Sequence, residues 1–235
     1  MTPVEPDPAQ LDGLLEKMRA EWDARARQNA RHFIANANAE WTDEDFFESG
    51  RRNVAEQILT DQGNICQGKD PQKMKVLEIG CGAGRITRAL AEVFGEVYAV
   101  DVSGEMIAQA KAALADVPNA HVFQNNGADL RVLGDVRVDF AFSYIVFQHI
   151  PSREVIYNYV REVYRLLRPG GLFKFQVQGA EFEEAKSGTD TWFGIHFSDE
   201  EAIKMAEECG FEARHRRHDT GQGPQYFWLW FFKKP

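Results

Sequence analysis

A short apolar run that breaks into three alternating glycines most constrains what this chain of 235 residues can fold into. Residues 76–84 read Val-Leu-Glu-Ile-Gly-Cys-Gly-Ala-Gly. The apolar part suits a buried strand, and Gly80, Gly82 and Gly84 allow a sharp turn that brings bare backbone against a ligand. Apolar residues then recur at helical spacing over 85–94. A strand, a glycine turn and a helix N-terminus together predict a nucleotide-binding unit.

The glycine spacing indicates which nucleotide. In the dinucleotide fingerprint, G-x-G-x-x-G, the third glycine would stand at Arg85, whereas here it is Gly84, and Glu78 precedes the turn. The pattern Glu-x-Gly-x-Gly-x-Gly resembles motif I of the class I S-adenosylmethionine (SAM)-dependent methyltransferases. This resemblance implies a loop around the amino-acid end of SAM, with S-adenosylhomocysteine (SAH) as the product. A glycine turn that binds no ligand is the alternative.

The order of elements predicts an α/β fold. Helices are expected over 10–34, from Thr42 to about 59, over 84–94 and 104–115, from Ser152 to the turn at 168–171, and from Ser198 to Cys209. Strands are expected over 75–79, 96–100, 121–124, 138–143, 172–177, 211–217 and 225–233. The last two strands are too closely connected for a crossover helix, so they must be antiparallel. The prediction is a doubly wound seven-stranded, mostly parallel sheet with a C-terminal antiparallel hairpin, as in the Rossmann-like methyltransferase fold, and an N-terminal helical cap.

The resemblance implies cofactor contacts in several segments besides the glycine turn. Asp101 follows the second strand and can accept hydrogen bonds from both ribose hydroxyls, although it could instead cap the next turn. Met106 could lie against adenine or belong to a helix core. Asn126 to Asp129 resemble the motif that holds the adenine amino group, with a solvated Asn-Gly turn as the alternative. The full predicted set is Glu78, Gly80, Cys81, Gly82, Gly84, Asp101, Val102, Met106, Asn126, Gly127, Ala128, Asp129 and Ser143.

Catalysis needs little beyond orientation, because the sulfonium is already a good leaving group. A general base is required only if the acceptor is protonated. His149 follows the fourth strand, and histidine is a common general base; His196 and Tyr226 are further candidates. Packing on the cofactor side is the alternative for His149.

Two regions are expected to enclose the acceptor. Residues 1–70 predict a helical cap over a methyltransferase domain at 71–235, with aromatic residues Trp22, Phe33, Trp41, Phe46 and Phe47. Arg51 or Arg52 could meet the cofactor carboxylate, or these helices could simply pack on the domain. An insertion at 179–197 carries Phe182, Trp192, Phe193 and Phe197, which would line an apolar pocket or cover the sheet edge.

Composition excludes several classes of protein. The formal charge of −9, with scattered basic residues, argues against a nucleic-acid partner. No stretch is long and apolar enough to span a membrane, and the first residues lack a signal-peptide pattern. Three cysteines without a paired spacing, and six histidines without ligand spacing, predict a cytoplasmic protein with no metal site.

The sequence therefore predicts transfer of the methyl group of SAM to an oxygen, nitrogen or carbon atom of a small-molecule acceptor. A non-catalytic module that binds SAM or another nucleotide is the first alternative. An NAD-type oxidoreductase is the second, and Arg85 and the terminal hairpin disfavour it. The oligomeric state is left open.

Overall fold

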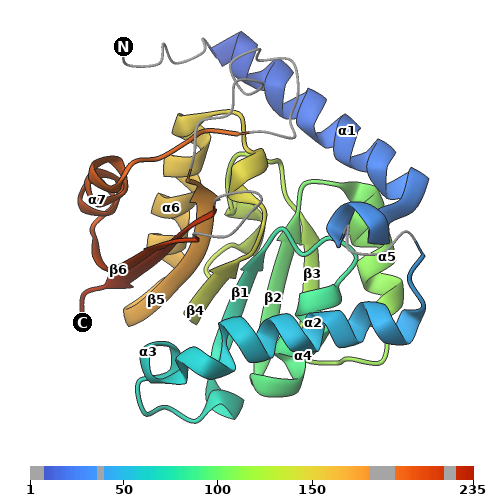
Figure 1. Cartoon of the computed structure of the whole chain (residues 1–235), viewed down its shortest axis with the longest axis horizontal. Coiled ribbons are helices and arrows are strands. Elements are labelled where there is room, and N and C mark those ends of the chain that lie inside the picture. Colours follow the sequence, from blue (N-terminus) through green and yellow to red (C-terminus); the bar gives the residue numbers. More distant parts are fainter. Residues whose placement is uncertain (1–7, 36–39, 180–193, 220–225) are drawn as a thin grey trace.

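The computed structural model of the chain describes residues 8–35, 40–179, 194–219 and 226–235. Its centre is one seven-stranded sheet in the order β3-β2-β1-β4-β5-β7-β6 (Figure 1). The strands are β1 (Lys75–Ile79), β2 (Glu96–Asp101), β3 (Ala120–Gln124), β4 (Val138–Ser143), β5 (Leu167–Gln178), β6 (Phe211–His218) and β7 (Tyr226–Lys233). Strands β1 to β5 pair in parallel, while β7 is antiparallel to both β5 and β6. The predicted mostly parallel sheet with its antiparallel C-terminal pair is confirmed.

Seven α-helices surround the sheet in the described part of the chain. They are α1 (Pro8–Ile34), α2 (Asp43–Gln57), α3 (Gln62–Cys66), α4 (Arg85–Val93), α5 (Gly104–Ala113), α6 (Arg153–Leu166) and α7 (Asp199–Glu208). Short 3₁₀ turns lie at η1 (Leu59–Asp61), η2 (Pro71–Lys73), η3 (Arg131–Leu133) and η4 (Phe147–His149). The predicted N-caps Thr42, Ser103, Ser152 and Ser198 all accept from their first helical turns.

The structure differs from the sequence prediction at three places. The first helix is interrupted at Asn29, whose backbone is extended (φ −170°, ψ 86°). The turn at 168–171 belongs to β5 instead of ending the preceding helix, because Leu167 already pairs with Val138. Helix α3 was not predicted; five residues are too few for a periodic pattern to be detected.

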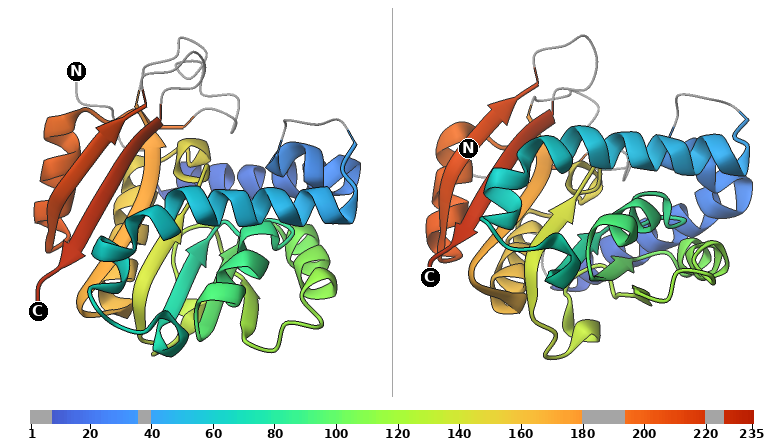
Figure 2. Two further views of the ribbon diagram at one scale, coloured as in Figure 1. Left: turned by 60° about the horizontal axis from the view of Figure 1, so that its bottom comes forward. Right: turned by 90° about the horizontal axis from the view of Figure 1, so that it is seen from below.

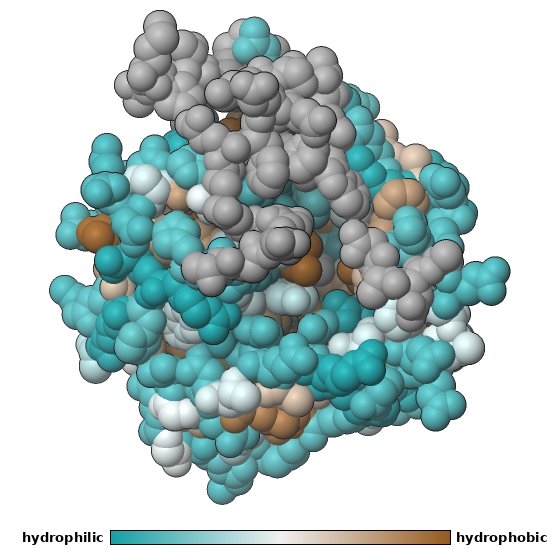
Figure 3. All heavy atoms as spheres, in the orientation of Figure 1, coloured by the Kyte–Doolittle hydropathy of each residue, from teal (hydrophilic) through white to brown (hydrophobic). Residues whose placement is uncertain are grey.

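The two faces of the sheet are covered by different helices. One face packs against α2, α3 and α4 through an apolar cluster that includes Phe142 and Trp228. The other packs against α6 and α7. Figure 2 shows α2 crossing one face above α4 and α7 lying beside the β6 edge. In Figure 3 most of the visible described surface is hydrophilic, and apolar residues show in a few places, with one group below the centre of the view. No helix within the described ranges is both long and apolar enough to cross a bilayer.

Candidate active site

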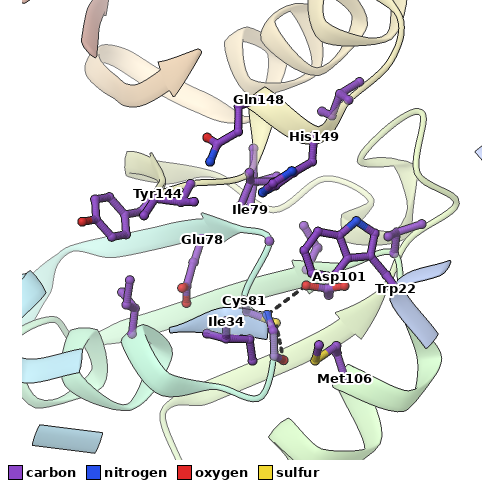
Figure 4. A pocket seen from close by; sticks show the side chains of 18 of the residues that line it. Trp22, Ile34, Glu78, Ile79, Cys81, Asp101, Met106, Tyr144, Gln148 and His149 are labelled. Atoms are coloured by element: carbon purple, nitrogen blue, oxygen red, sulfur yellow. Dashed lines mark hydrogen bonds between the residues drawn. The ribbon is translucent and has the colours of Figure 1, made fainter. Parts of the chain in front are cut away.

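A pocket opens where β1, β2 and β4 end, between the glycine turn and α1 (Figure 4). This is the carboxyl edge of the sheet, beside the point where the strand order reverses between β1 and β4, and open α/β folds bind ligands there. Met18 and Trp22 of α1 close one side of the pocket, and Tyr144 to Ile150, the segment after β4, close another.

Three glycines shape the floor of the pocket, and two of them face it. Gly80 (φ 78°) and Gly82 (φ 52°) line the pocket in left-handed backbone conformations. A Cβ atom on Gly80 would lie 2.2 Å from Cγ2 of Val146, and one on Gly82 would lie 2.7 Å from Cδ1 of Ile34. Gly84 instead caps the start of α4 and packs toward Leu114, so its role in the structure is the turn itself.

Asp101 organises the turn from the end of β2. One carboxylate oxygen accepts from the Gly82 N–H at 2.8 Å (Figure 4). The other accepts from the Ser103 N–H at 2.9 Å. Burial raises the pKa of Asp101, opposed by these backbone hydrogen bonds. Asp101 thus caps the turn, as one of the two predictions had it, and it also lines the pocket.

Glu78 is a buried acid in the pocket, 3% exposed. Its Oε2 accepts from the Thr87 hydroxyl at 2.6 Å. Burial raises the pKa of Glu78 to about 7, against the opposing effects of the Thr87 hydrogen bond and the charge of Arg85. A small change in surroundings therefore decides whether this group is charged at neutral pH.

The cation that reaches the pocket is Arg85, which sequence reasoning used only to reject a dinucleotide site. Arg85 is buried, and its guanidinium donates to Ser49 Oγ at 3.2 Å and Asn53 Oδ1 at 2.5 Å. Its Nε finds no hydrogen-bond partner in the part of the chain that the structure describes. The predicted Arg51 instead pairs with Glu92 on the exposed side of α2, and Arg52 is also exposed. The signal for Arg85 was the pair of polar residues, Ser49 and Asn53, one turn apart in α2.

The predicted adenine segment lies mostly outside the pocket. Met106 and Val102 line the pocket. Asn125, which was not predicted, also lines it, and its amide donates to the Tyr159 hydroxyl at 2.7 Å. Asn126 and Asp129 face a separate polar cleft. The Asn126 side chain accepts from the backbone N–H groups of Ala128 and Asp129, both at 2.9 Å. The backbone N–H groups of Ala128 and Asp129 are therefore bonded within the turn, and Gly127 packs beside Val102.

Two of the three candidate bases line the pocket. His149 is 8% exposed, and its ring meets Trp22 edge-on with 5.2 Å between centroids. Tyr226 lines the pocket from the start of β7. His196 does not; its backbone bridges Gln178, and its carbonyl accepts from Arg153 at 3.0 Å. Ser143 is also outside, donating to the Ile79 carbonyl at 3.0 Å and so joining β4 to β1.

The aromatic residues divide into lining and packing sets. Trp22 and Phe33 line the pocket, whereas Phe46 packs between Trp41 and Phe47. Phe197 is fully buried beneath the Arg153 guanidinium. Phe182, Trp192 and Phe193 lie outside the described residues. Within the described residues no group of three His, Cys, Asp or Glu could hold a metal ion.

Comparison with known proteins agrees with this geometry. Residues 77–175 match a family described as a methyltransferase domain. Malonyl-(acyl-carrier protein) O-methyltransferase of Enterobacter lignolyticus is 34% identical over 109 residues, which are 46% of this chain and 40% of that protein. The protein of the same name from Salmonella typhimurium is 32% identical over 167 residues, 68% of this chain and 60% of its own length. The chain thus spans 40% and 60% of these two curated relatives.

A solved structure shares the fold over almost the whole chain. Magnesium protoporphyrin IX methyltransferase from Synechocystis PCC 6803, with bound SAH, superposes with a TM-score of 0.67 at 16% identity, covering 93% of this chain and 99% of that one. Residues 77–175 thus match a methyltransferase domain, and the chain, with its motif from Glu78 to Gly84 and its antiparallel strand β7, shares the Rossmann-like fold of a solved methyltransferase.

Proposed function

We propose that this chain binds SAM in the pocket above the glycine turn and transfers its methyl group to a small-molecule acceptor by in-line displacement. The observation that carries the proposal is the pairing of charges along one pocket. Glu78 and Arg85 suit the ammonium and carboxylate of the methionine part, while Asp101 suits the ribose hydroxyls. SAM supplies an activated methyl group on a positively charged sulfur.

The residues present fit this cofactor. Arg85 is a buried cation whose Nε has no hydrogen-bond partner among the described residues, and a carboxylate is the group that such a donor best accommodates. Gly80 and Gly82 bring backbone to the pocket wall, where a side chain would collide with Val146 or Ile34. Residues 1–70 act as the cap in this proposal, since α1 supplies Met18, Trp22 and Ile34 to the pocket.

The chain's own contribution to the transfer is orientation and exclusion of water. His149 and Tyr226 are the two candidate bases that face the pocket, for acceptors that carry a proton. The names of similar proteins include a malonyl group on a carrier protein and magnesium protoporphyrin IX, which supports a small or carrier-linked acceptor. A cytoplasmic location and the lack of a nucleic-acid partner stay predictions from composition.

Calorimetry with SAH tests the cofactor assignment directly, and radiolabelled SAM tests transfer to candidate acceptors. We expect the full chain to bind SAH in a one-to-one ratio. A chain that is folded by circular dichroism and binds no SAH would refute the proposal. Binding of SAH without transfer to any acceptor would favour the alternative of a non-catalytic binding module.

Arg85→Met should weaken SAH binding by roughly tenfold or more. A hydrogen bond between charged groups contributes about 1.5–3 kcal/mol, and methionine retains most of the apolar stem. Arg51→Met is the matched control, because Arg51 is an exposed arginine paired with Glu92 outside the pocket. Titration calorimetry on both variants checks the expectation, and equal affinities would show that Arg85 does not contact the cofactor.

A further inference from the structure

Two buried glutamines in the pocket each have one amide atom that no described residue pairs with. Gln148 and Gln178 are 4% and 3% exposed, and both line the pocket. Oε1 of Gln148 and Nε2 of Gln178 find no hydrogen-bond partner among the described residues. Leaving such a buried atom unpaired costs free energy, so a ligand that pairs with it recovers that free energy.

The two amides belong to one wall of the pocket. Gln178 ends β5 directly opposite Tyr226 of β7 in the strand register. The side chain of Gln148, in η4 after β4, acts on the Tyr226 phenol, because it opposes the rise in the pKa of Tyr226 that burial causes. Figure 4 shows the Gln148 amide reaching from the upper rim toward the space above Glu78 and Tyr144. Tyr144 completes this wall, and its ring stacks on Trp228 with 5.8 Å between centroids.

The wall formed by Tyr144, Gln148, Gln178 and Tyr226 carries no formal charge. The charged groups of the pocket are assigned to the cofactor in the proposed function. A carboxylate or an ammonium on the acceptor would therefore lose its hydration against neutral amides and phenols, with no opposite charge from this wall. A neutral group is accommodated at lower cost if it offers a donor to Gln148 Oε1 and an acceptor to Gln178 Nε2.

We infer that Gln148 and Gln178 form the acceptor subsite and that they select an uncharged acceptor in which a hydroxyl lies beside a carbonyl oxygen. The hydroxyl donates to Gln148, and the carbonyl accepts from Gln178. This inference rests on the proposed function, because it assigns the rest of the pocket to SAM.

Matched neutral and anionic probes test the inference on the full chain loaded with SAH. Glycolamide and salicylamide present a hydroxyl beside a neutral carbonyl, and glycolate and salicylate are their anionic counterparts. Calorimetry and ligand-observed NMR should show that at least one amide binds, and that it binds more tightly than its acid. Gln148→Leu and Gln178→Leu should each weaken binding of that amide by roughly tenfold. The affinity for SAH should stay unchanged in both variants.

Gln72→Leu is the matched control, since Gln72 is an exposed glutamine far from the pocket lining that donates to the Val93 carbonyl. Gln178→Glu keeps the side-chain shape and removes the donor, so it should weaken the amide probe even if a leucine variant folds poorly. Tighter binding of the acid, unchanged amide binding in the Gln178 variants, or no amide binding by a chain that binds SAH would overturn the inference. Failure of the wild-type chain to bind SAH would refute the proposed function instead.

Discussion

Asp101→Ala is expected to weaken SAH binding by between about tenfold and a hundredfold. The carboxylate lines the pocket at the end of β2, where the ribose hydroxyls of the cofactor would donate to it. Each hydrogen bond to a charged acceptor contributes about 1.5–3 kcal/mol, and the same side chain also holds the Gly82 and Ser103 N–H groups. Removal of the carboxylate therefore deletes the contacts to the ligand and, at the same time, the hydrogen bond that holds the glycine turn. Titration calorimetry with SAH measures the loss.

Two further variants separate these effects. Asp101→Asn keeps one carbonyl acceptor and the side-chain size, so the turn should be retained better and the loss of affinity should be smaller. Asp116→Ala removes an exposed aspartate that pairs with Arg88 outside the pocket, and it should bind SAH like the wild type. An Asp101→Ala variant that keeps wild-type affinity while remaining folded would contradict the ribose assignment.

The local features of this fold could be predicted from the sequence. The glycine turn, the serine and threonine caps and the terminal hairpin are each encoded within a few consecutive residues. Asp101 could be placed for the same reason, since it is the last residue of strand β2. The turn from Asn126 to Asp129 was located, but its internal hydrogen bonds depend on the backbone path, and sequence pattern does not determine that path.

Contacts between distant segments could not be predicted. Arg85 faces Ser49 and Asn53 because α2 and α4 approach closely at Gly50, where a Cβ atom would lie 2.3 Å from the Arg85 carbonyl oxygen. Neither helix alone fixes this approach, so the predicted helical cap offered Arg51 and Arg52 as candidates instead. Gln178 likewise meets Tyr226 only through the register of β5 with β7.

Glu78 should make cofactor binding dependent on pH near neutrality. Its pKa is raised to about 7 by burial, so in the free protein the carboxyl is largely protonated below that pH. The ammonium of SAH favours the carboxylate, and binding below pH 7 must therefore release a proton. The affinity should fall by up to about tenfold for each pH unit below 7. Calorimetry between pH 6 and pH 8 covers about one unit on either side of that pKa. It should show the dependence of SAH affinity on pH in the wild type and no such dependence in Glu78→Gln.

The same group gives a test on the free protein, with the sign fixed by linkage. The folded state binds the Glu78 proton more tightly than the unfolded chain, whose carboxyl titrates near 4.5. The contribution of Glu78 to the free energy of unfolding therefore falls as pH rises from about 4.5 to about 7, by roughly 3 kcal/mol, and is constant above that range. Glu78→Gln should remove this pH-dependent loss of stability. Above about pH 7 and without SAH, the variant should therefore be more stable than the wild type, and it should bind SAH less tightly at the same pH. Glu92→Gln changes an exposed acid outside the pocket and should retain the wild-type pH dependence. Urea unfolding at several pH values measures the difference, and parallel curves for the wild type and Glu78→Gln would show that Glu78 remains charged in the fold.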